Sequence, residues 1–394
     1  MSIRLSNRVK NIKPSQTLAI TARAKELREQ GQDIIGLGAG EPDFDTPDHI
    51  KEAAIQAIRN GFTKYTAVDG TPSLKQAVID KFKRDNNLDY EMNQILVSVG
   101  GKQTSFNLLQ ALINPGDEVI IPAPYWVSYP DMTLLADGVP VIIHAGIEQG
   151  YKITPDQLQA AITERTKLIF INSPSNPTGA VYTRQELAAL GEVLKQHPQV
   201  LIATDDMYEH ILWTEAPFVN IVNACPELYD RTVVMNGVSK AYSMTGWRIG
   251  YCGGPAELVA AMKKTQSQST SNPCSISQVA AEAALNGDQA CIAPMLKAFK
   301  ERHAFVVERL NAIDGIDCIE SDGTFYTFAD ARKLIADSSK FSNDVELADY
   351  LLGEAKVALV PGSAFGAEGY IRISYATSME MLDQALERIA KALG

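Results

Sequence analysis

The chain has little positive charge and few cysteines. Its 394 residues carry 36 lysines and arginines against 47 aspartates and glutamates, which gives a net charge of -11. Nucleic acids and anionic membrane surfaces repel an acidic protein, so we expect neither as a partner. The five cysteines form no CxxC pair, and their odd number leaves one unpaired in any disulfide scheme. We therefore expect reduced, structural thiols and no metal site.

Long apolar runs, internal repeats and low-complexity tracts are also missing. No run is long enough for a signal peptide or a membrane span, so we expect a cytoplasmic protein. Hydrophobic residues make up 45% and charged residues 21%, which is typical of an ordinary globular protein. A chain of this length usually exceeds one hydrophobic core, and we expect two domains.

The middle of the chain alternates short, β-branched apolar runs with helical stretches. This pattern is typical of a mostly parallel sheet that is covered by helices on both faces. Seven such runs can be counted, and they begin at Ile95, Asp117, Val139, Lys167, Val200, Thr232 and Trp247.

Both ends of the chain have a different pattern. A helix is expected over 16–30 and another from Asp48 toward Gly61, with a turn-rich, irregular segment between them. Beyond about Gln278, long helices such as 290–310 alternate with short strands and a closing helix from Met379. The prediction is an α/β fold. Its large domain, residues 48–285, holds the mostly parallel seven-stranded sheet sandwiched by helices, and both termini, residues 1–47 and 286–394, form a smaller α+β domain.

Polar residues follow the strand-forming runs, where an open α/β sheet places its ligand. Taken singly, each could be structural, as a tight turn, a core aromatic, a turn cap or a solvated lysine. Together they supply an acid, an aromatic plate, an amide, a phenol, an amine and a glycine-rich helix start, which a phosphorylated pyridine aldehyde requires. They are Gly100, Gly101, Lys102, Gln103, Trp126, Asn176, Asp205, Tyr208 and Lys240.

Each part of such a ligand needs a particular residue type. A phosphate needs backbone N–H groups at a helix start, here from Gly101 to Gln103, and a cation such as Arg248. A pyridine nitrogen stays protonated beside a carboxylate, which raises its pKa by about 1–3 units, and Asp205 would fill this role. An aldehyde needs an amine with a depressed pKa, and Lys240 follows a predicted strand among small residues.

With these residues in place, the chain resembles the class I pyridoxal-phosphate-dependent aminotransferases of fold type I, and among them the bacterial aspartate aminotransferases. The resemblance spans nearly the whole chain. It implies a ping-pong transfer of the amino group of L-aspartate to 2-oxoglutarate, in a homodimer with shared active sites. It rests on GEPDFDTP, TKYT, GGKQ, PYWVSYP, NSPSNPTGAVY, DDMYEH, SKAYSMTGWRIGY, FYTF, VPGSAFG and YIRISYATS.

The resemblance implies a role toward the cofactor for each site residue. Lys240 would hold pyridoxal 5'-phosphate as a Schiff base and move the substrate's proton, while Asp205 pairs with the pyridine nitrogen. Asn176 and Tyr208 would hydrogen-bond the phenolic oxygen, and Trp126 would stack on the ring. The phosphate would be held by Ser239, Arg248, the backbone of Gly101 and Lys102, and Tyr65 from the second subunit.

The resemblance also implies the substrate pocket. Arg372 would bind the substrate's α-carboxylate with its forked guanidinium, beside Asn176, Trp126 and the backbone of Gly40. Lys102 would reach the distal carboxylate, with Thr17 near the entrance. One departure concerns the phosphate, because many family members have a hydroxyl residue three positions before the lysine, where this chain has Gly237.

Several alternatives stay open at this point. Arg372 could form a structural salt bridge, and Lys102 could serve only the phosphate loop or solvent. Some relatives accept prephenate or prefer aromatic amino acids, and a lyase could use the same cofactor on the same fold. A sensor domain of a transcription regulator is disfavoured by the acidic balance and by a start within the small-domain segment. A nicotinamide enzyme is disfavoured because no GxGxxG follows the first strand.

Overall fold

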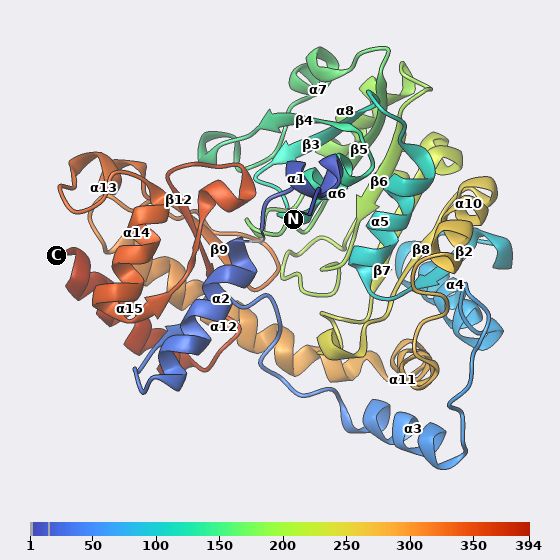
Figure 1. Cartoon of the computed structure of the whole chain (residues 1–394), viewed down its shortest axis with the longest axis horizontal. Helices are drawn as coiled ribbons and strands as arrows, with labels where there is room; N and C mark the ends of the chain where they lie inside the picture. Colours follow the sequence, from blue (N-terminus) through green and yellow to red (C-terminus); the bar gives the residue numbers. More distant parts are fainter. Residues whose placement is uncertain (1–2, 15) are drawn as a thin grey trace.

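A seven-stranded sheet forms the centre of the molecule (Figure 1). The computed structural model describes residues 3–14 and 16–394. The strand order is β2-β8-β7-β6-β5-β3-β4, and only β8 runs antiparallel to its two neighbours. The strands are β2 (Ile95–Ser98), β3 (Glu118–Ala123), β4 (Val139–His144), β5 (Thr166–Asn172), β6 (Leu201–Asp205), β7 (Thr232–Gly237) and β8 (Gly250–Gly253).

Alternating side chains of the strands feed two separate cores, one on each face of the sheet. On β5, Leu168 and Phe170 join one core, and Ile169 and Ile171 join the other. Burial on both faces explains why these strands are continuous apolar runs. The first core is covered by α5 (Gly101–Leu112), α6 (Ser128–Leu135) and α10 (Ala256–Ser267), and the second by α4 (Pro72–Asn86), α7 (Pro155–Ala161), α8 (Arg184–Lys195) and α11 (Ser275–Asn286).

Helix boundaries follow ordinary capping chemistry. The Thr71 side chain accepts from the backbone N–H of Leu74, and Pro72 occupies the first turn of α4. Asn87 closes that helix in the left-handed conformation, with φ 51°. In contrast, α5 begins after Gly100 without any side-chain cap, so its first N–H groups are left for another acceptor.

The smaller domain is built from both ends of the chain. The short strand β1 (Ile35–Gly36) pairs in parallel with β10 (Val357–Ala358), which joins the N-terminal segment to the C-terminal part. A second, three-stranded antiparallel sheet has the order β11-β12-β9, and its strands β9 and β12 lie among the C-terminal helices in Figure 1. The remaining elements named here are α1 (Asn7–Asn11), α2 (Gln16–Glu29), α3 (Asp48–Arg59), α9 (Ile221–Ala224), α12 (Ala293–Asn311), β9 (Tyr326–Asp330), α13 (Arg332–Asp337), α14 (Asp344–Tyr350), β11 (Val360–Pro361), β12 (Tyr370–Ser374) and α15 (Met379–Leu393).

The predicted architecture is confirmed, with two local differences. All seven runs are strands of one mostly parallel sheet. The last begins at Gly250 rather than Trp247, because residues 245–247 form a 3-10 turn and Arg248 adopts φ 56°. The segment expected to be irregular contains β1, which is stabilised by a distant partner strand rather than by its own sequence.

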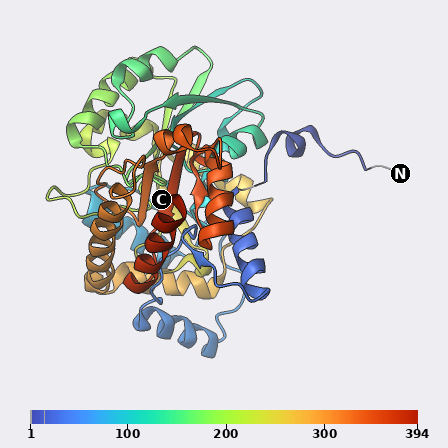
Figure 2. The same ribbon diagram turned by 90° about the vertical axis from the view of Figure 1, so that its left-hand side faces the viewer.

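The segment that carries α1 extends away from the body of the molecule (Figure 2). Its tie to the large domain is an ion pair between Arg8 and Asp137. Along the residues that the structure describes, no helix combines the length and the apolar character that crossing a membrane requires.

A buried ion pair ties α4 to the turn after β6. The Lys81 side chain is 1% exposed, and its ammonium contacts the Glu209 carboxylate and Asn86 Oδ1, the latter at 2.7 Å. Glu209 also accepts from Asn86 Nδ2 at 2.7 Å and from Asn236 Nδ2 at 2.9 Å. Since Asn236 lies on β7, this network fixes β7 and the turn after β6 to the same helix.

We expect Lys81→Met to lower the free energy of unfolding by about 3–5 kcal/mol, because it removes the buried ammonium that pairs with Glu209 and leaves this carboxylate with two amides and the partly exposed His210 imidazole. Lys83→Met is the matched control on the same helix. The Lys83 side chain is 54% exposed in its pair with Asp89, so that variant should cost no more than about 1 kcal/mol. Urea unfolding curves measure both, and equal losses would contradict the prediction.

Candidate active site

Side chains from both domains meet at the carboxyl ends of the central strands. Lys240 follows β7, Asp205 ends β6, and Asn176 follows β5. Hydrogen bonds join these elements to the small domain, among them one from Arg372 on β12 to Asn176 and one between the hydroxyls of Tyr208 and Tyr326. Most of the predicted site residues are thereby brought into one crevice.

The Lys240 amine lies in this crevice. Its Nζ donates to the carbonyl of Gly40 and lies 5.8 Å from the ring centroids of both Tyr208 and Phe325. The pKa of Lys240 is lowered to about 8, chiefly by burial; Arg372 contributes to the lowering, and Glu41 opposes it. A solvated surface lysine is therefore excluded, and a fraction of the amine is neutral at pH 7.

The Asp205 carboxylate has a phenol as its partner. Tyr129 Oη donates to Oδ2 at 2.6 Å, and the backbone N–H of Met207 donates to Oδ1 at 3.3 Å. Among the described residues no lysine or arginine forms an ion pair with Asp205. Burial raises the pKa of this carboxyl above its usual value, although Tyr129 and Lys240 oppose the effect. A cationic ligand would supply the partner that this carboxylate lacks.

Tyr129 was missed from the sequence, although a signal was present. It lies three residues after Trp126, in the first turn of α6, and the two ring centroids are 5.2 Å apart. The phenol is 1% exposed and stacks on Phe170, with 4.3 Å between ring centroids. Stacking on Phe170 therefore holds the Tyr129 ring in the orientation in which its hydroxyl donates to Asp205.

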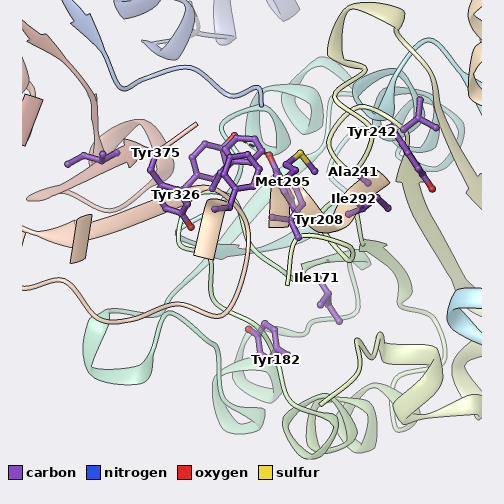
Figure 3. Packing of buried hydrophobic residues seen from close by; sticks show 14 of the residues in the cluster. Ile171, Tyr182, Tyr208, Ala241, Tyr242, Ile292, Met295, Tyr326 and Tyr375 are labelled. Atoms are coloured by element: carbon purple, nitrogen blue, oxygen red, sulfur yellow. Dashed lines mark hydrogen bonds between the residues drawn. The ribbon is translucent and has the colours of Figure 1, made fainter. Parts of the chain in front are cut away.

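Tyr208 and Tyr326 point their hydroxyls toward one another, at 3.1 Å, and lie together in Figure 3. Burial raises the pKa of the Tyr208 hydroxyl well above its usual value, and Tyr326 adds to the shift. Both groups therefore stay protonated and can donate a hydrogen bond to a bound anion. Tyr326 stands in the FYTF motif, but sequence reasoning gave it no role.

A positively charged cradle forms at the start of α5. Gly100 has φ 84°, and a Cβ added there would lie 2.5 Å from a terminal nitrogen of Arg248. Only glycine therefore lets the guanidinium approach this backbone. The N–H of Gln103 already donates to the Gly100 carbonyl at 3.0 Å, and its side-chain amide donates to Asn107. The helix start thus offers the N–H groups of Gly101 and Lys102 rather than that of Gln103.

The glycine at position 237 has a packing reason. A Cβ there would lie 3.0 Å from the carbonyl oxygen of Ile249 and 3.1 Å from the Met207 methyl group. A hydroxyl side chain would require these neighbours to move, so packing favours glycine at this position. Ser239, two residues later, is 6% exposed and carries the hydroxyl beside Lys240.

Arg372 is a buried cation that forms no ion pair with a carboxylate among the described residues. It is 2% exposed and its guanidinium donates to Asn176 Oδ1 at 2.9 Å and to the Gly38 carbonyl at 2.8 Å. Its Nε is buried without a hydrogen-bond partner. The rings of Tyr326 and Phe365 lie 4.4 and 4.8 Å from the guanidinium carbon. No carboxylate of the described residues pairs with Arg372, so its role is not a structural salt bridge within them. The guanidinium is therefore able to bind an external carboxylate.

The other predicted residues lie around this centre. The Lys102 side chain reaches the surface and holds its Nζ 5.2 Å from the Trp126 ring centroid. The surrounding protein removes part of the water around this ammonium, which lowers its pKa, and the charge of Arg248 lowers it further. Thr17 Oγ1, on α2, is buried without a hydrogen-bond partner. Tyr65 is different, because it is 92% exposed and does not join the crevice of its own chain.

Comparison with known proteins agrees with this chemistry. A family model described as aminotransferase class I and II matches residues 32–389. The chain belongs to this family. Aminotransferases of this family use pyridoxal phosphate and act on amino and oxo acids. The buried amine of Lys240, the unpaired carboxylate of Asp205 and the helix start beside Arg248 fit the aldehyde, the ring nitrogen and the phosphate of that cofactor.

Individual relatives of this aminotransferase match along its whole length. It is 63% identical to an aspartate/prephenate aminotransferase of Nitrosomonas europaea, over 99% of this chain and all of the relative. It is 51% identical to an aspartate aminotransferase of Bacillus sp. (strain YM-2), over 98% of both chains. Among solved structures, the aspartate aminotransferase of Rhizobium meliloti has a TM-score of 0.96 at 49% identity, covering 100% of this chain and 99% of the other.

The low pKa of Lys240 generates a prediction about cofactor uptake. Only the neutral amine attacks an aldehyde, so the rate of covalent uptake of pyridoxal phosphate by cofactor-free protein should rise with pH and level off above about 8. N-acetyl-lysine amide should keep gaining rate up to about pH 10.4. Stopped-flow absorbance measures both reactions, and a protein profile that follows the free lysine would refute the assignment.

Proposed function

We propose that this aminotransferase transfers the amino group of L-aspartate to 2-oxoglutarate, giving oxaloacetate and L-glutamate. The proposal rests on two cations at the crevice that form no ion pair with a carboxylate among the described residues. Arg372 is buried without a carboxylate, and the Lys102 ammonium stands over Trp126 on the large domain. Two such cations suit a substrate with two carboxylates.

The bound cofactor supplies an aldehyde that takes up the amino group and a ring that withdraws electrons. We propose that Lys240 Nζ tethers it and, once released, carries the proton between the substrate's α-carbon and the cofactor. The Asp205 carboxylate, held by Tyr129, would keep the ring nitrogen protonated. Asn176 and Tyr208 would donate to the phenolic oxygen, and Trp126 would cover the ring. Ser239, Arg248, Gly101 and Lys102 would hold the phosphate.

The substrate pocket follows from the same contacts. Arg372 would bind the α-carboxylate with both terminal nitrogens, and Asn176 and Gly40 would line that end. Lys102 would bind the distal carboxylate, with Thr17 at the entrance. An aspartate aminotransferase of Thermus thermophilus, 44% identical over 99% of this chain and 100% of the other, with a TM-score of 0.93, was solved with maleate. Maleate is itself a dicarboxylate, which supports a pocket with two cations.

A second amino acceptor is favoured by the relatives. Those of Nitrosomonas europaea and Cereibacter sphaeroides, at 63% and 57% identity, are named aspartate/prephenate aminotransferases. Prephenate carries two carboxylates and would meet the same two cations. We therefore propose prephenate as the alternative oxo acid, with aspartate or glutamate as the donor.

We further propose a homodimer in which Tyr65 reaches the phosphate of the second copy. Tyr65 is 92% exposed, and Ile55, Ile58 and Phe62 beside it are 37%, 54% and 39% exposed. This exposed apolar surface on α3 and the following loop supports contact with another protein surface. The pairing of β1 with β10 supports a domain division at residues 1–47, 48–285 and 286–394.

Arg372→Lys should lower kcat/KM for aspartate by about 10²-fold or more, because a point charge cannot form two parallel hydrogen bonds with a carboxylate. The absorbance of the lysine-bound cofactor should be unchanged, since Arg372 lies on the substrate side. Steady-state kinetics and an absorbance spectrum test this together. A variant with native kinetics would remove Arg372 from the substrate site.

The proposed reaction is tested with one substrate at a time. L-aspartate alone should convert the cofactor to its amine form, which persists until 2-oxoglutarate or prephenate is added, whereas a lyase would return to the starting spectrum without an oxo acid. Lys102→Ala should raise the KM for aspartate by about tenfold or more while sparing amino acids without a second carboxylate. Unchanged aspartate turnover would show that Lys102 does not bind the distal carboxylate.

A further inference from the structure

The loop before α4 combines an exposed tip with a rigid base. Tyr65 extends into solvent, yet residues 62–71 around it are held by buried side chains of three helices. At one end of this loop, Ser275 Oγ donates to the Phe62 carbonyl at 2.8 Å. At the other end, Asp69 pairs with Lys75 at 2.7 Å and with Lys263 at 2.9 Å. Contacts with α4, α10 and α11 therefore fix the conformation of the loop.

Gln278 on α11 is the centre of this clamp. It is 0% exposed, and its amide makes three hydrogen bonds. Nε2 donates to Thr66 Oγ1 at 2.9 Å and to the Pro273 carbonyl at 2.8 Å, and Oε1 accepts from the N–H of Thr71 at 2.8 Å. One amide thus joins both ends of the 66–71 segment to the start of α11.

Gln266 on α10 makes a second contact of the same kind. It is also 0% exposed, and Nε2 donates to the carbonyls of Val68 and Val97 at 2.7 and 2.8 Å. Gly70 brings the loop against β2, because a Cβ there would lie 2.7 Å from a Val97 methyl group, and its φ is 102°. Gln266 therefore hydrogen-bonds both β2 and the loop. The hydrogen bonds that Gln278 makes with described residues reach the loop and Pro273, just before α11.

Buried amides of this kind hold the loop in one conformation. Any other loop conformation would leave a buried donor without its hydrogen bond, which costs about 1–3 kcal/mol. At its base the clamp serves the sheet of this chain, because the N–H of Val97 on β2 donates to the Asp69 carbonyl at 3.1 Å. At the tip, however, Tyr65 is 92% exposed. A fixed direction of the Tyr65 side chain is therefore of use only for a contact outside its own subunit.

We propose that Gln278 is a positioning residue for the active site of the second copy. By holding Thr66, it sets the direction of the neighbouring Tyr65, whose hydroxyl then donates to the phosphate of the cofactor bound by the partner subunit. This inference rests on the proposed homodimer with shared sites and extends it to a residue that touches neither substrate nor cofactor.

Heterodimers separate effects within one subunit from effects across the interface. One subunit carries Lys240→Ala, so the only lysine-bound cofactor lies in the other subunit and takes its Tyr65 from the Lys240→Ala chain. Gln278→Glu, which removes both donated hydrogen bonds, is placed in either subunit. Titration with pyridoxal phosphate, followed by the absorbance of the lysine-bound form, gives the cofactor Kd.

Gln278→Glu should raise this Kd about tenfold when it lies in the Lys240→Ala subunit, and less than twofold in the other. Thr66→Val removes only the hydroxyl of the half-buried Thr66 and should act in the same direction without a folding defect. Gln289→Glu is the matched control, because Gln289 bonds the carbonyl of Gly287 at 2.8 Å beyond the far end of α11 and does not touch the loop. It should change the Kd less than twofold in either subunit.

Tyr65→Phe in the Lys240→Ala subunit distinguishes the two levels of the proposal. If it leaves the Kd unchanged, the shared site itself is wrong. If Tyr65→Phe weakens cofactor binding across the interface but Gln278→Glu and Thr66→Val do not, the shared site holds and the role of Gln278 is refuted. Equal effects of Gln278→Glu in both subunits would also refute it, since they would indicate general damage.

Discussion

Enclosing a lysine amine between two domains is the constraint from which the rest of the site follows. Water no longer solvates the ammonium of Lys240 fully, and burial lowers its pKa to about 8. A lysine that is neutral for part of the time at physiological pH is a nucleophile and a base, which a surface lysine is not. The enclosure needs contributions from both domains, because the amine rests on the Gly40 carbonyl from one side and near Tyr208 from the other.

Buried charges elsewhere in the molecule are treated differently, and the contrast separates structure from function. Lys81 is as deeply buried as Arg372, yet it lies on Glu209 and Asn86, and its charge is balanced within the chain. Arg372 has only an amide and a carbonyl, and its Nε has no hydrogen-bond partner. Asp205 likewise has a phenol and a backbone N–H. Arg372 and Asp205, whose charges a ligand could neutralise, therefore have only uncharged hydrogen-bond partners among the described residues.

The sequence predicted the part of this design that depends on local pattern. Apolar runs locate the strand ends, and this pattern alone predicts that Asp205, Asn176 and Lys240 lie at one edge of the sheet. Contacts that depend on side-chain direction could not be found this way. Tyr129 lies 76 positions before the carboxylate to which it donates, and no pattern specifies that its ring turns toward β6.

Other features depend on distant packing and were invisible for the same reason. Strand β1 has only two residues and exists because β10 pairs with it from the other end of the chain. The crowding at Gly237 comes from Ile249 and Met207, which belong to different segments. The amide of Gln278 meets the 66–71 loop across more than two hundred positions. Sequence reasoning assigns residue types to a site, whereas the geometry that orients them is a property of the assembled fold.

If Arg372 binds the substrate as proposed, its position would link substrate binding to the arrangement of the two domains. Arg372 lies on β12 of the small domain, its Asn176 partner follows β5 of the large domain, and the Gly38 carbonyl belongs to the N-terminal segment. A carboxylate that binds the guanidinium beside Asn176 therefore contacts both domains and holds them together. It also brings negative charge close to Lys240, whose pKa Arg372 lowers. Because an anion would offset the charge of Arg372, a carboxylate bound there would raise the proton affinity of the Lys240 amine, which is the change that the proposed proton transfer requires.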